Sequence, residues 1–234
     1  MTEAYYAKNK HGYMLYRDRR FAEYIFGQIE NMTGDALRSC DTAVELGAGM
    51  GRFSYALPPR FRRVHLIEPS RDYAALLKEQ FTGPDIEVYA LTANEYFQMH
   101  KAEGKAVCAG FHILHHLVPA QRKEIFDRIR GNGWKAVFVE PNPWNPLFLL
   151  QLLVTPDMSF KEEWRYLTLT RRRLRREMRA SGISLRGYKR ICFLPPVIAD
   201  RLLRWPASLP LMHFLDKLNA LLPCFGSYQM VYGE

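Results

Sequence analysis

The chain has 234 residues, 33 Lys and Arg against 24 Asp and Glu, and a formal net charge of +9. Apolar residues make up 48% and aromatic residues 13%, which suffices for a sizeable core and excludes a wholly disordered chain. The four cysteines lie far apart without CxxC spacing. We therefore expect no metal site and no disulfide framework, and a cytoplasmic location. We also expect no signal peptide and no membrane span, because no apolar run reaches about 18 residues.

The positive charge is concentrated in one late segment. Residues 160–204 hold 13 Lys or Arg and 4 Asp or Glu, whereas the remaining residues hold 20 of each kind. Such a segment is compatible with a solvated helix face, with a lipid or phosphorylated ligand, or with nucleic acid. The excess charge is therefore a property of this segment and not of the whole chain.

The first two thirds of the chain alternate between predicted helices and strands. Helical spacing of aromatic and apolar residues predicts an amphipathic helix within residues 1–39. Strands are expected at Thr42–Leu46, Val64–Ile67, Ile86–Leu91, Ala106–Phe111 and Lys135–Glu140, and helices at Arg52–Leu57, Arg71–Gln80 and Pro119–Arg130. Because parallel strands need crossover connections, this alternation predicts an α/β fold with helices on both faces of a parallel sheet.

The alternation ends after Pro141. Thr170–Ala180 is predicted to be a basic helix, and Pro195–Pro223 contains helical fragments. Further strands are expected at Ile183–Phe193 and Ser227–Tyr232.

Glycines follow the first predicted strand directly. The segment reads Val44-Glu45-Leu46-Gly47-Ala48-Gly49-Met50-Gly51. Glycine permits the tight turn and the close backbone approach that a nucleotide-like ligand needs. The spacing is G-x-G-x-G, whereas the dinucleotide fingerprint is G-x-G-x-x-G, and Arg52 occupies the position of its third glycine. This difference argues against a nicotinamide cofactor.

An acidic residue, Glu68, ends the second predicted strand, 17 positions beyond Gly51. A carboxylate at this place can accept hydrogen bonds from both hydroxyls of a ribose. The alternative for a lone acid is a favourable charge at a helix N-terminus. Its pairing with the glycine loop favours ribose binding.

These residues resemble motifs of the class I S-adenosylmethionine-dependent methyltransferases. The segment from Glu45 to Gly51 is similar to their first motif, and Glu68 matches their ribose-binding acid. Phe111–Leu117 is similar to a histidine-containing stretch after the fourth strand in small-molecule members, the type 11 and type 12 branch. Glu140-Pro141-Asn142-Pro143 resembles the end of their fifth strand. The resemblance is close over residues 40–145.

The resemblance implies a Rossmann-like, doubly wound, seven-stranded and mostly parallel sheet, with S-adenosyl-L-methionine as methyl donor. It also implies a single methyltransferase domain over residues 1–234. Within it, residues 1–39 would form an N-terminal helical lid and residues 40–145 the donor-binding core. Residues 146–234 would supply acceptor-side elements, a helical insertion near the C-terminus and the last strands.

The resemblance assigns donor contacts to the strand ends and to the N-terminal lid. The residues concerned are Glu45, Gly47, Ala48, Gly49, Gly51, Glu68, Pro69, Thr92, Ala93, Phe111, His112, Tyr13 and Tyr16. Glu45 would bind the amino group of the donor, and Phe111 with His112 would flank its methionine portion. The chain departs from the family pattern at two places. Thr92 and Ala93 stand where an acid often lies near the adenine, and Lys105 stands where an Asp often begins the fourth strand.

Methyl transfer from a sulfonium depends mainly on positioning and on the exclusion of water. A base is needed only where the acceptor is a hydroxyl or an acidic carbon. His115, His116 and Glu140 are the candidates, and the histidines favour methylation of O or C over N. The structural alternative has one histidine capping the next helix, the other packing in the core, and Glu140 without a chemical role.

Large apolar side chains after the fifth strand favour a large or lipid-like acceptor within the expected class of small or lipid-like molecules, and ordinary packing is the alternative for each of them. They are Trp144, Phe148, Trp164, Phe193, Trp205 and Phe214. The apolar run Leu147–Val154 beside the basic helix also predicts peripheral contact with an anionic membrane. The sequence carries no signal for an oligomeric state.

Two other functions stay open at this point. One is a nucleic-acid (RNA) methyltransferase that uses residues 160–204, and the other is a non-catalytic donor-binding module of the same fold. Nucleic acid is disfavoured, because no N/D-P-P-Y/F motif follows the fourth strand.

Overall fold

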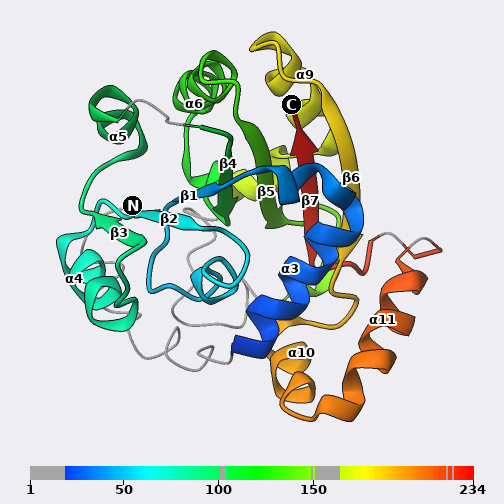
Figure 1. Ribbon diagram of the computed structural model, residues 1–234. Coiled ribbons are helices and arrows are strands. Elements are labelled where there is room, and N and C mark those ends of the chain that lie inside the picture. Colours follow the sequence, from blue (N-terminus) through cyan, green and yellow to red (C-terminus); the bar gives the residue numbers. More distant parts are fainter. Residues whose placement is uncertain (1–18, 101–103, 149, 151–163, 220, 223) are drawn as a thin grey trace.

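The computed structural model describes residues 19–100, 104–148, 150, 164–219, 221, 222 and 224–234. Its strands are β1 Thr42–Leu46, β2 Arg63–Ile67, β3 Ile86–Tyr89, β4 Ala106–Phe111, β5 Lys135–Pro141, β6 Leu185–Ile191 and β7 Tyr228–Gly233. They form one seven-stranded sheet in the order β3-β2-β1-β4-β5-β7-β6 (Figure 1). β1 to β5 are parallel, and β7 runs antiparallel between β5 and β6. The expected Rossmann-like, seven-stranded, mostly parallel sheet is confirmed.

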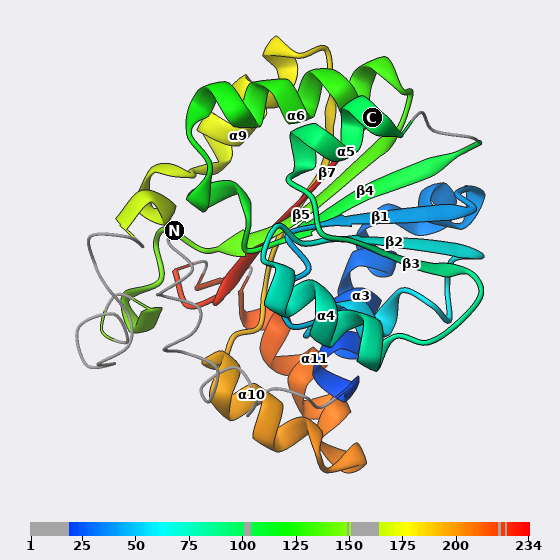
Figure 2. The same cartoon turned by 90° about the vertical axis from the view of Figure 1, so that its left-hand side faces the viewer.

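Helices cover both faces of this sheet. They are α3 Arg19–Thr33, α4 Arg71–Gln80, α5 Ala93–Met99, α6 Pro119–Gly131, α9 Arg171–Ala180, α10 Pro196–Leu203 and α11 Leu209–Leu218. α3, α4, α10 and α11 lie on one face, and α5, α6 and α9 lie on the other (Figure 2). Each layer encloses its own cluster of buried apolar side chains against the sheet. β1, β4 and β7 are buried at every position, as expected for strands covered on both faces.

Short capping signals in the sequence explain where several helices begin. The Ser70 hydroxyl accepts the backbone N–H of Tyr73 at the start of α4. Thr92 and Glu95 form a reciprocal capping box at the start of α5. The Thr170 hydroxyl accepts the backbone N–H of Arg173 at the start of α9. These caps satisfy N–H groups that have no partner inside the helix.

α9 is the basic helix predicted from the sequence. It buries Leu174 and Met178, which lie four residues apart, and it exposes most of its arginines. Glu177 accepts from both Arg122 on α6 and Arg173 on α9, so part of this charge is neutralised. Much of this helix is therefore an ordinary charged surface exposed to solvent.

The expected helix over Arg52–Leu57 is wrong. The segment forms only a short 3-10 helix, η2, at Ser54–Ala56. Gly51 with its positive φ precedes the segment, and Pro58, which has no backbone N–H to donate, follows it, so helical hydrogen bonding cannot extend in either direction. β3 also ends at Tyr89 and not at Leu91, because the chain turns there into the cap of α5.

The helical insertion near the C-terminus is confirmed. It lies between β6 and β7 and consists of α10, the 3-10 helix η5 at Pro206–Ser208, and α11. These two helices stand beside α3 (Figure 1). Across the part of the chain that the structure describes, every helix is too short or too polar to cross a membrane.

Candidate active site

The glycine loop lies at the carboxyl end of β1. β1 pairs with β2 on one side and with β4 on the other. The chain therefore adds β2 and β3 on one side of β1, and then reverses to add β4 and β5 on the other side. In doubly wound sheets, ligands bind outside the carboxyl ends of the strands at such a reversal. The sequence motif and the topology therefore select the same edge of the sheet.

Two glycines of this loop serve different purposes. Gly51 has a φ of +80°, and a Cβ added there would lie 2.5 Å from Cε2 of Phe81, so packing against α4 requires glycine. Gly49 has a φ of +57°, and a Cβ added there would meet no atom within 4 Å. Gly51 thus brings the loop close to α4, whereas Gly49 borders open space that a ligand can enter.

Glu68 is held against this loop. Its Oε2 accepts the backbone N–H of Gly49 at 2.8 Å, and its Oε1 accepts the backbone N–H of Ser70 at 2.9 Å. The side chain is buried, and burial raises its pKa above the ordinary value. Each oxygen keeps a lone pair for a further donor, as ribose binding requires.

Glu45 lies deeper, at the second-last position of β1. Its carboxyl group is buried and accepts the Ser54 hydroxyl at 2.6 Å. Burial raises the pKa of Glu45 to about 8, and the charge of Glu68 adds to the effect. A cationic ligand nearby would stabilise the ionised form, so the amino group assigned to this position by resemblance fits the electrostatics.

Phe111 ends β4 next to the glycine loop, and His112 follows it. The Phe111 ring stacks on Phe53, with ring centroids 4.6 Å apart. His112 has a φ of +58°, a left-handed conformation that costs a non-glycine residue about 1–3 kcal/mol. Its Nε2 is buried and has no hydrogen-bond partner among the described residues. Burial lowers the pKa of His112 well below its ordinary value, so the ring is neutral and presents a polar nitrogen that a ligand can satisfy.

The fold has solved relatives, although no protein-family model matches the sequence and no curated protein matches it. A SAM-dependent methyltransferase from Archaeoglobus fulgidus has a TM-score of 0.59 at 15% identity, covering 91% of this chain and 94% of that one. The chain has the fold of the SAM-dependent methyltransferases.

Two further methyltransferase-fold structures carry more specific descriptions. A cyclopropane synthase from Mycobacterium tuberculosis has a TM-score of 0.53 at 11% identity, covering 89% of this chain and 82% of that one. A mitomycin 7-O-methyltransferase has a TM-score of 0.54 at 15% identity, covering 92% of this chain and 53% of that one. At these identities the similarity establishes the fold, and the chemistry has to be argued from the site.

The remaining residues expected to contact the donor do not all lie beside the glycine loop. The Thr92 hydroxyl is used in the capping box of α5 and bonds Glu95, and Ala93 is the first residue of that helix. Pro69 follows Glu68 and is exposed. Tyr13 and Tyr16, expected to cover the donor, lie outside the described residues.

The three candidates for a base lie next to one another in this methyltransferase fold. His115 Nδ1 is 2.6 Å from Glu140 Oε2, and both side chains are buried. Glu140 Oε1 accepts the backbone N–H groups of Ile113 and Leu114 at 2.9 and 2.7 Å. Glu140 therefore fixes both the loop after β4 and the orientation of the imidazole.

The His116 ring contacts that of His115, with centroids 3.8 Å apart and the ring planes tilted by 47°. Burial lowers the pKa of His116 well below its ordinary value. Neither histidine is the N-cap of the following helix, because Val118 occupies that position at the start of α6. The capping alternative for one histidine is therefore wrong, and the His115 side chain is buried.

Sequence reasoning did not identify several residues of the site. Ser54 bonds Glu45, Phe53 stacks on Phe111, and Tyr228 on β7 contacts His112 with ring centroids 4.7 Å apart. Ser54 and Phe53 were assigned to a helix without a role. Tyr228 is distant in sequence, and only the strand order β5-β7 brings it to this edge.

The aromatic residues expected to wall the acceptor differ in exposure. Phe148 and Phe193 are half-buried, whereas Trp144, Trp164, Trp205 and Phe214 are exposed. Trp205 and Phe214 belong to the α10–α11 insertion, on its solvent side. They form an outer apolar surface and not the wall of an enclosed site.

Proposed function

We propose that this protein is an S-adenosylmethionine-dependent methyltransferase. The observation that carries the proposal is the buried Glu68 carboxylate, bound to the Gly49 N–H and bordering open space at the topological reversal of the sheet. Glu68 would hold the ribose and Glu45 the amino group, while the loop backbone approaches the donor. When bound, the donor supplies a methyl group on a sulfonium. The residues of this chain bind it, orient it and exclude water.

The donor site is tested by calorimetry with S-adenosylhomocysteine. The wild-type protein should bind it in the micromolar range. Glu68→Gln removes the negative charge from the ribose hydrogen bonds, so its affinity should fall by at least about tenfold. Glu79→Gln, an exposed acid on α4, is the matched control and should bind as the wild type does. A folded wild-type protein that binds no S-adenosylhomocysteine would disprove the proposal.

The proposed acceptor is a small or lipid-like molecule methylated at O or C. The His115–Glu140 pair supports this choice, since a carboxylate-oriented imidazole is suited to remove a proton from a hydroxyl or an acidic carbon. The pair lies after β4 and at the end of β5, at the same edge as the donor site. For this step His115 would accept the proton at Nε2, and Glu140 would stabilise the resulting cation.

The acceptor class is tested with a donor that carries a labelled methyl group. We expect label to enter the organic phase when a total lipid extract or a panel of small hydroxylated molecules is supplied. Label found in added transfer RNA instead would favour the nucleic-acid alternative. Donor binding without transfer to any of these would favour a non-catalytic module.

We also infer peripheral contact of the α10–α11 insertion with an anionic membrane. Large apolar side chains are exposed along it, namely Ile198, Trp205, Leu209, Leu211, Phe214, Leu221 and Leu222. Arg201, Arg204 and Lys217 are exposed beside them. Apolar residues that can enter the headgroup region, flanked by cations that attract anionic lipids, are the combination that interfacial helices use.

A further inference from the structure

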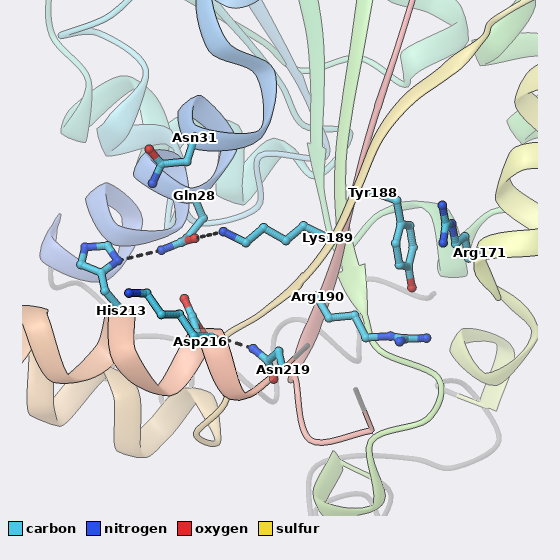
Figure 3. Close-up of a pocket in the computed structure, with 10 residues that line it drawn as sticks. Gln28, Asn31, Arg171, Tyr188, Lys189, Arg190, His213, Asp216 and Asn219 are labelled. Atoms are coloured by element: carbon cyan, nitrogen blue, oxygen red, sulfur yellow. Dashed lines mark hydrogen bonds between the residues drawn. The ribbon is translucent and has the colours of Figure 1, made fainter. Parts of the chain in front are cut away.

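A cavity of about 620 Å³ lies along β6, the edge strand of the sheet, away from the glycine loop. α3, α9, β6 and α11 all contribute to its walls. Figure 3 shows the side chains of Tyr188 and Arg190 on one side of β6, with Arg171 near them, and Lys189 on the other side, reaching toward Gln28. Its volume lies within the range of about 300–1,000 Å³ that is usual for small-molecule sites.

The cavity is strongly cationic. Arg171, Lys189, Arg190 and Lys217 line it, and none of the four forms an ion pair with a carboxylate of the described residues. Asp216 is the single acid in the lining. Its Oδ2 accepts the Tyr24 hydroxyl, and its Oδ1 accepts the backbone N–H of Phe193 at 3.3 Å. The cavity therefore keeps an excess of positive charge.

Two of these cations are arginines arranged around one aromatic ring. The guanidinium carbon of Arg171 lies 4.8 Å from the centroid of Tyr188, and that of Arg190 lies 5.6 Å from it. Nε of Arg190 is buried and has no hydrogen-bond partner among the described residues. A buried donor without a partner is rare in folded proteins, and a guanidinium donor suits the oxygens of a phosphate.

Lys189, on the other side of β6, is positioned by a short chain of hydrogen bonds. Lys189 Nζ donates to Gln28 Oε1 at 2.6 Å, and Gln28 Nε2 lies 3.0 Å from His213 Nδ1 (Figure 3). Gln28 is buried on α3 and His213 belongs to α11. The ammonium of Lys189 is thus held in place and keeps two further N–H groups for a ligand.

We propose that this edge cavity binds a phosphate-bearing small molecule. Its charge, the buried Arg190 Nε and the oriented Lys189 each favour a phosphate over a neutral ligand. The site also uses three of the basic residues that make residues 160–204 so positive, namely Arg171, Lys189 and Arg190. The proposal does not depend on methyl transfer, because it predicts binding of phosphate alone.

The register of the sheet shows where this cavity lies relative to the candidate base. Arg190 is paired with Gln229, and Gln229 is paired with Glu140, so the three side chains point to the same face. Two strand spacings, about 10 Å, separate Arg190 from Glu140. The buried Gln229 lies between them and donates to the carbonyl oxygens of Pro141 and Leu169, so the cavity and the candidate base are separate sites.

The experiment is calorimetry with inorganic phosphate and pyrophosphate at 0.15 M salt, a condition that screens general surface charge. The wild type should bind both, and pyrophosphate more tightly, because it carries more negative charge into a cationic cavity. Arg190→Gln and, separately, Lys189→Gln should each weaken pyrophosphate binding by tenfold or more. Arg186→Gln is the matched control, since Arg186 is an exposed arginine of the same strand that pairs with Glu234.

The possible results distinguish failure of the cavity proposal from failure of the methyltransferase proposal. No binding by the folded wild type, or equal weakening by Arg186→Gln and Arg190→Gln, overturns the proposal. Glycerol phosphate in solution and vesicles containing phosphatidic acid distinguish a free phosphate ester from a lipid headgroup. Pyrophosphate binding that persists in a protein unable to bind S-adenosylhomocysteine would disprove the methyltransferase proposal and leave the cavity assignment standing.

Discussion

The Nδ1 atom of His115 lies 2.6 Å from Oε2 of Glu140, and both side chains are buried at the end of neighbouring parallel strands. A carboxylate can only accept, so the hydrogen bond places the ring proton on Nδ1. Nε2 is then the basic nitrogen of the neutral ring. The second oxygen of Glu140 is fixed by two backbone N–H groups, which leaves the carboxylate little freedom to turn away.

Glu140→Gln should reverse the tautomer of His115. The amide oxygen of Gln can still accept the N–H groups of Ile113 and Leu114, which turns its NH₂ toward the imidazole. His115 Nδ1 must then accept, and the ring proton moves to Nε2. Long-range ¹⁵N–¹H NMR distinguishes the two tautomers, and the other histidines serve as internal references. The same tautomer in both proteins would show that Glu140 does not orient the ring.

Glu45 should make stability depend on pH. Its pKa is about 8 in the folded protein against an ordinary value of 4.5, so the folded state retains a proton that the unfolded state releases. Its contribution is therefore fully present below pH 4.5 and is lost as the pH rises through 8. The slope should be at most about 1.4 kcal/mol per pH unit.

Urea unfolding of the wild type and of Glu45→Gln between pH 6.5 and 8 checks this prediction. The difference between the two proteins cancels the contributions of the histidines whose pKa values are lowered. The variant should gain stability relative to the wild type as the pH rises. A difference that stays constant with pH would show that Glu45 is ionised in the folded state.

Gly49→Ala should weaken ligand binding while costing no more stability than the same change at Gly34. Gly49 and Gly34 share a φ of +57°, and neither has an atom within 4 Å of an added Cβ. Alanine at either place should cost about 1–2 kcal/mol for the left-handed conformation. Only Gly49→Ala should weaken S-adenosylhomocysteine binding, by about tenfold or more, because its methyl group occupies the space beside Glu68. Equal affinities in the two variants would place the ligand elsewhere.

The double variant Trp205→Ser and Phe214→Ser should detach the protein from anionic vesicles. The two side chains are 74% and 59% exposed, and each contributes about 1.5–3 kcal/mol when it is transferred out of water. Partitioning onto phosphatidylglycerol vesicles should fall by at least about tenfold in a sedimentation assay. Met99→Ser is the control, since Met99 is 68% exposed on α5, on the other layer. Equal sedimentation of the wild type with neutral and anionic vesicles would contradict membrane contact through this surface.

The sheet was predictable because local signals and topology agree there. The buried runs of β1, β4 and β5 have limits that match the expected ones closely; Gly47 directly follows β1, and Pro141 ends β5. Segments with conflicting signals were less predictable. Arg52–Leu57 has apolar residues at helical spacing, but the turn at Gly51 and the proline after it leave only a 3-10 helix.

The sequence predicted which residues belong to the candidate site, but not which of them contact one another. His115 and Glu140 were both candidates from the sequence, and their pairing follows only from the adjacency of β4 and β5. The edge cavity was not predictable, because Gln28, Arg171, Lys189 and His213 come from four separate elements. Their convergence depends on β6 being the edge strand, which composition and periodicity do not encode.

The position of β7 has a consequence for the order in which the fold can be completed. This strand follows every other strand in the sequence, yet it lies between β5 and β6 and pairs with both. During synthesis β1 to β5 can assemble as soon as they leave the ribosome, whereas β6 has no neighbour in the sheet until residue 233 has emerged. The buried Tyr228, which contacts His112, arrives in the same step, so this ring contact of the candidate site forms only once β7 has paired.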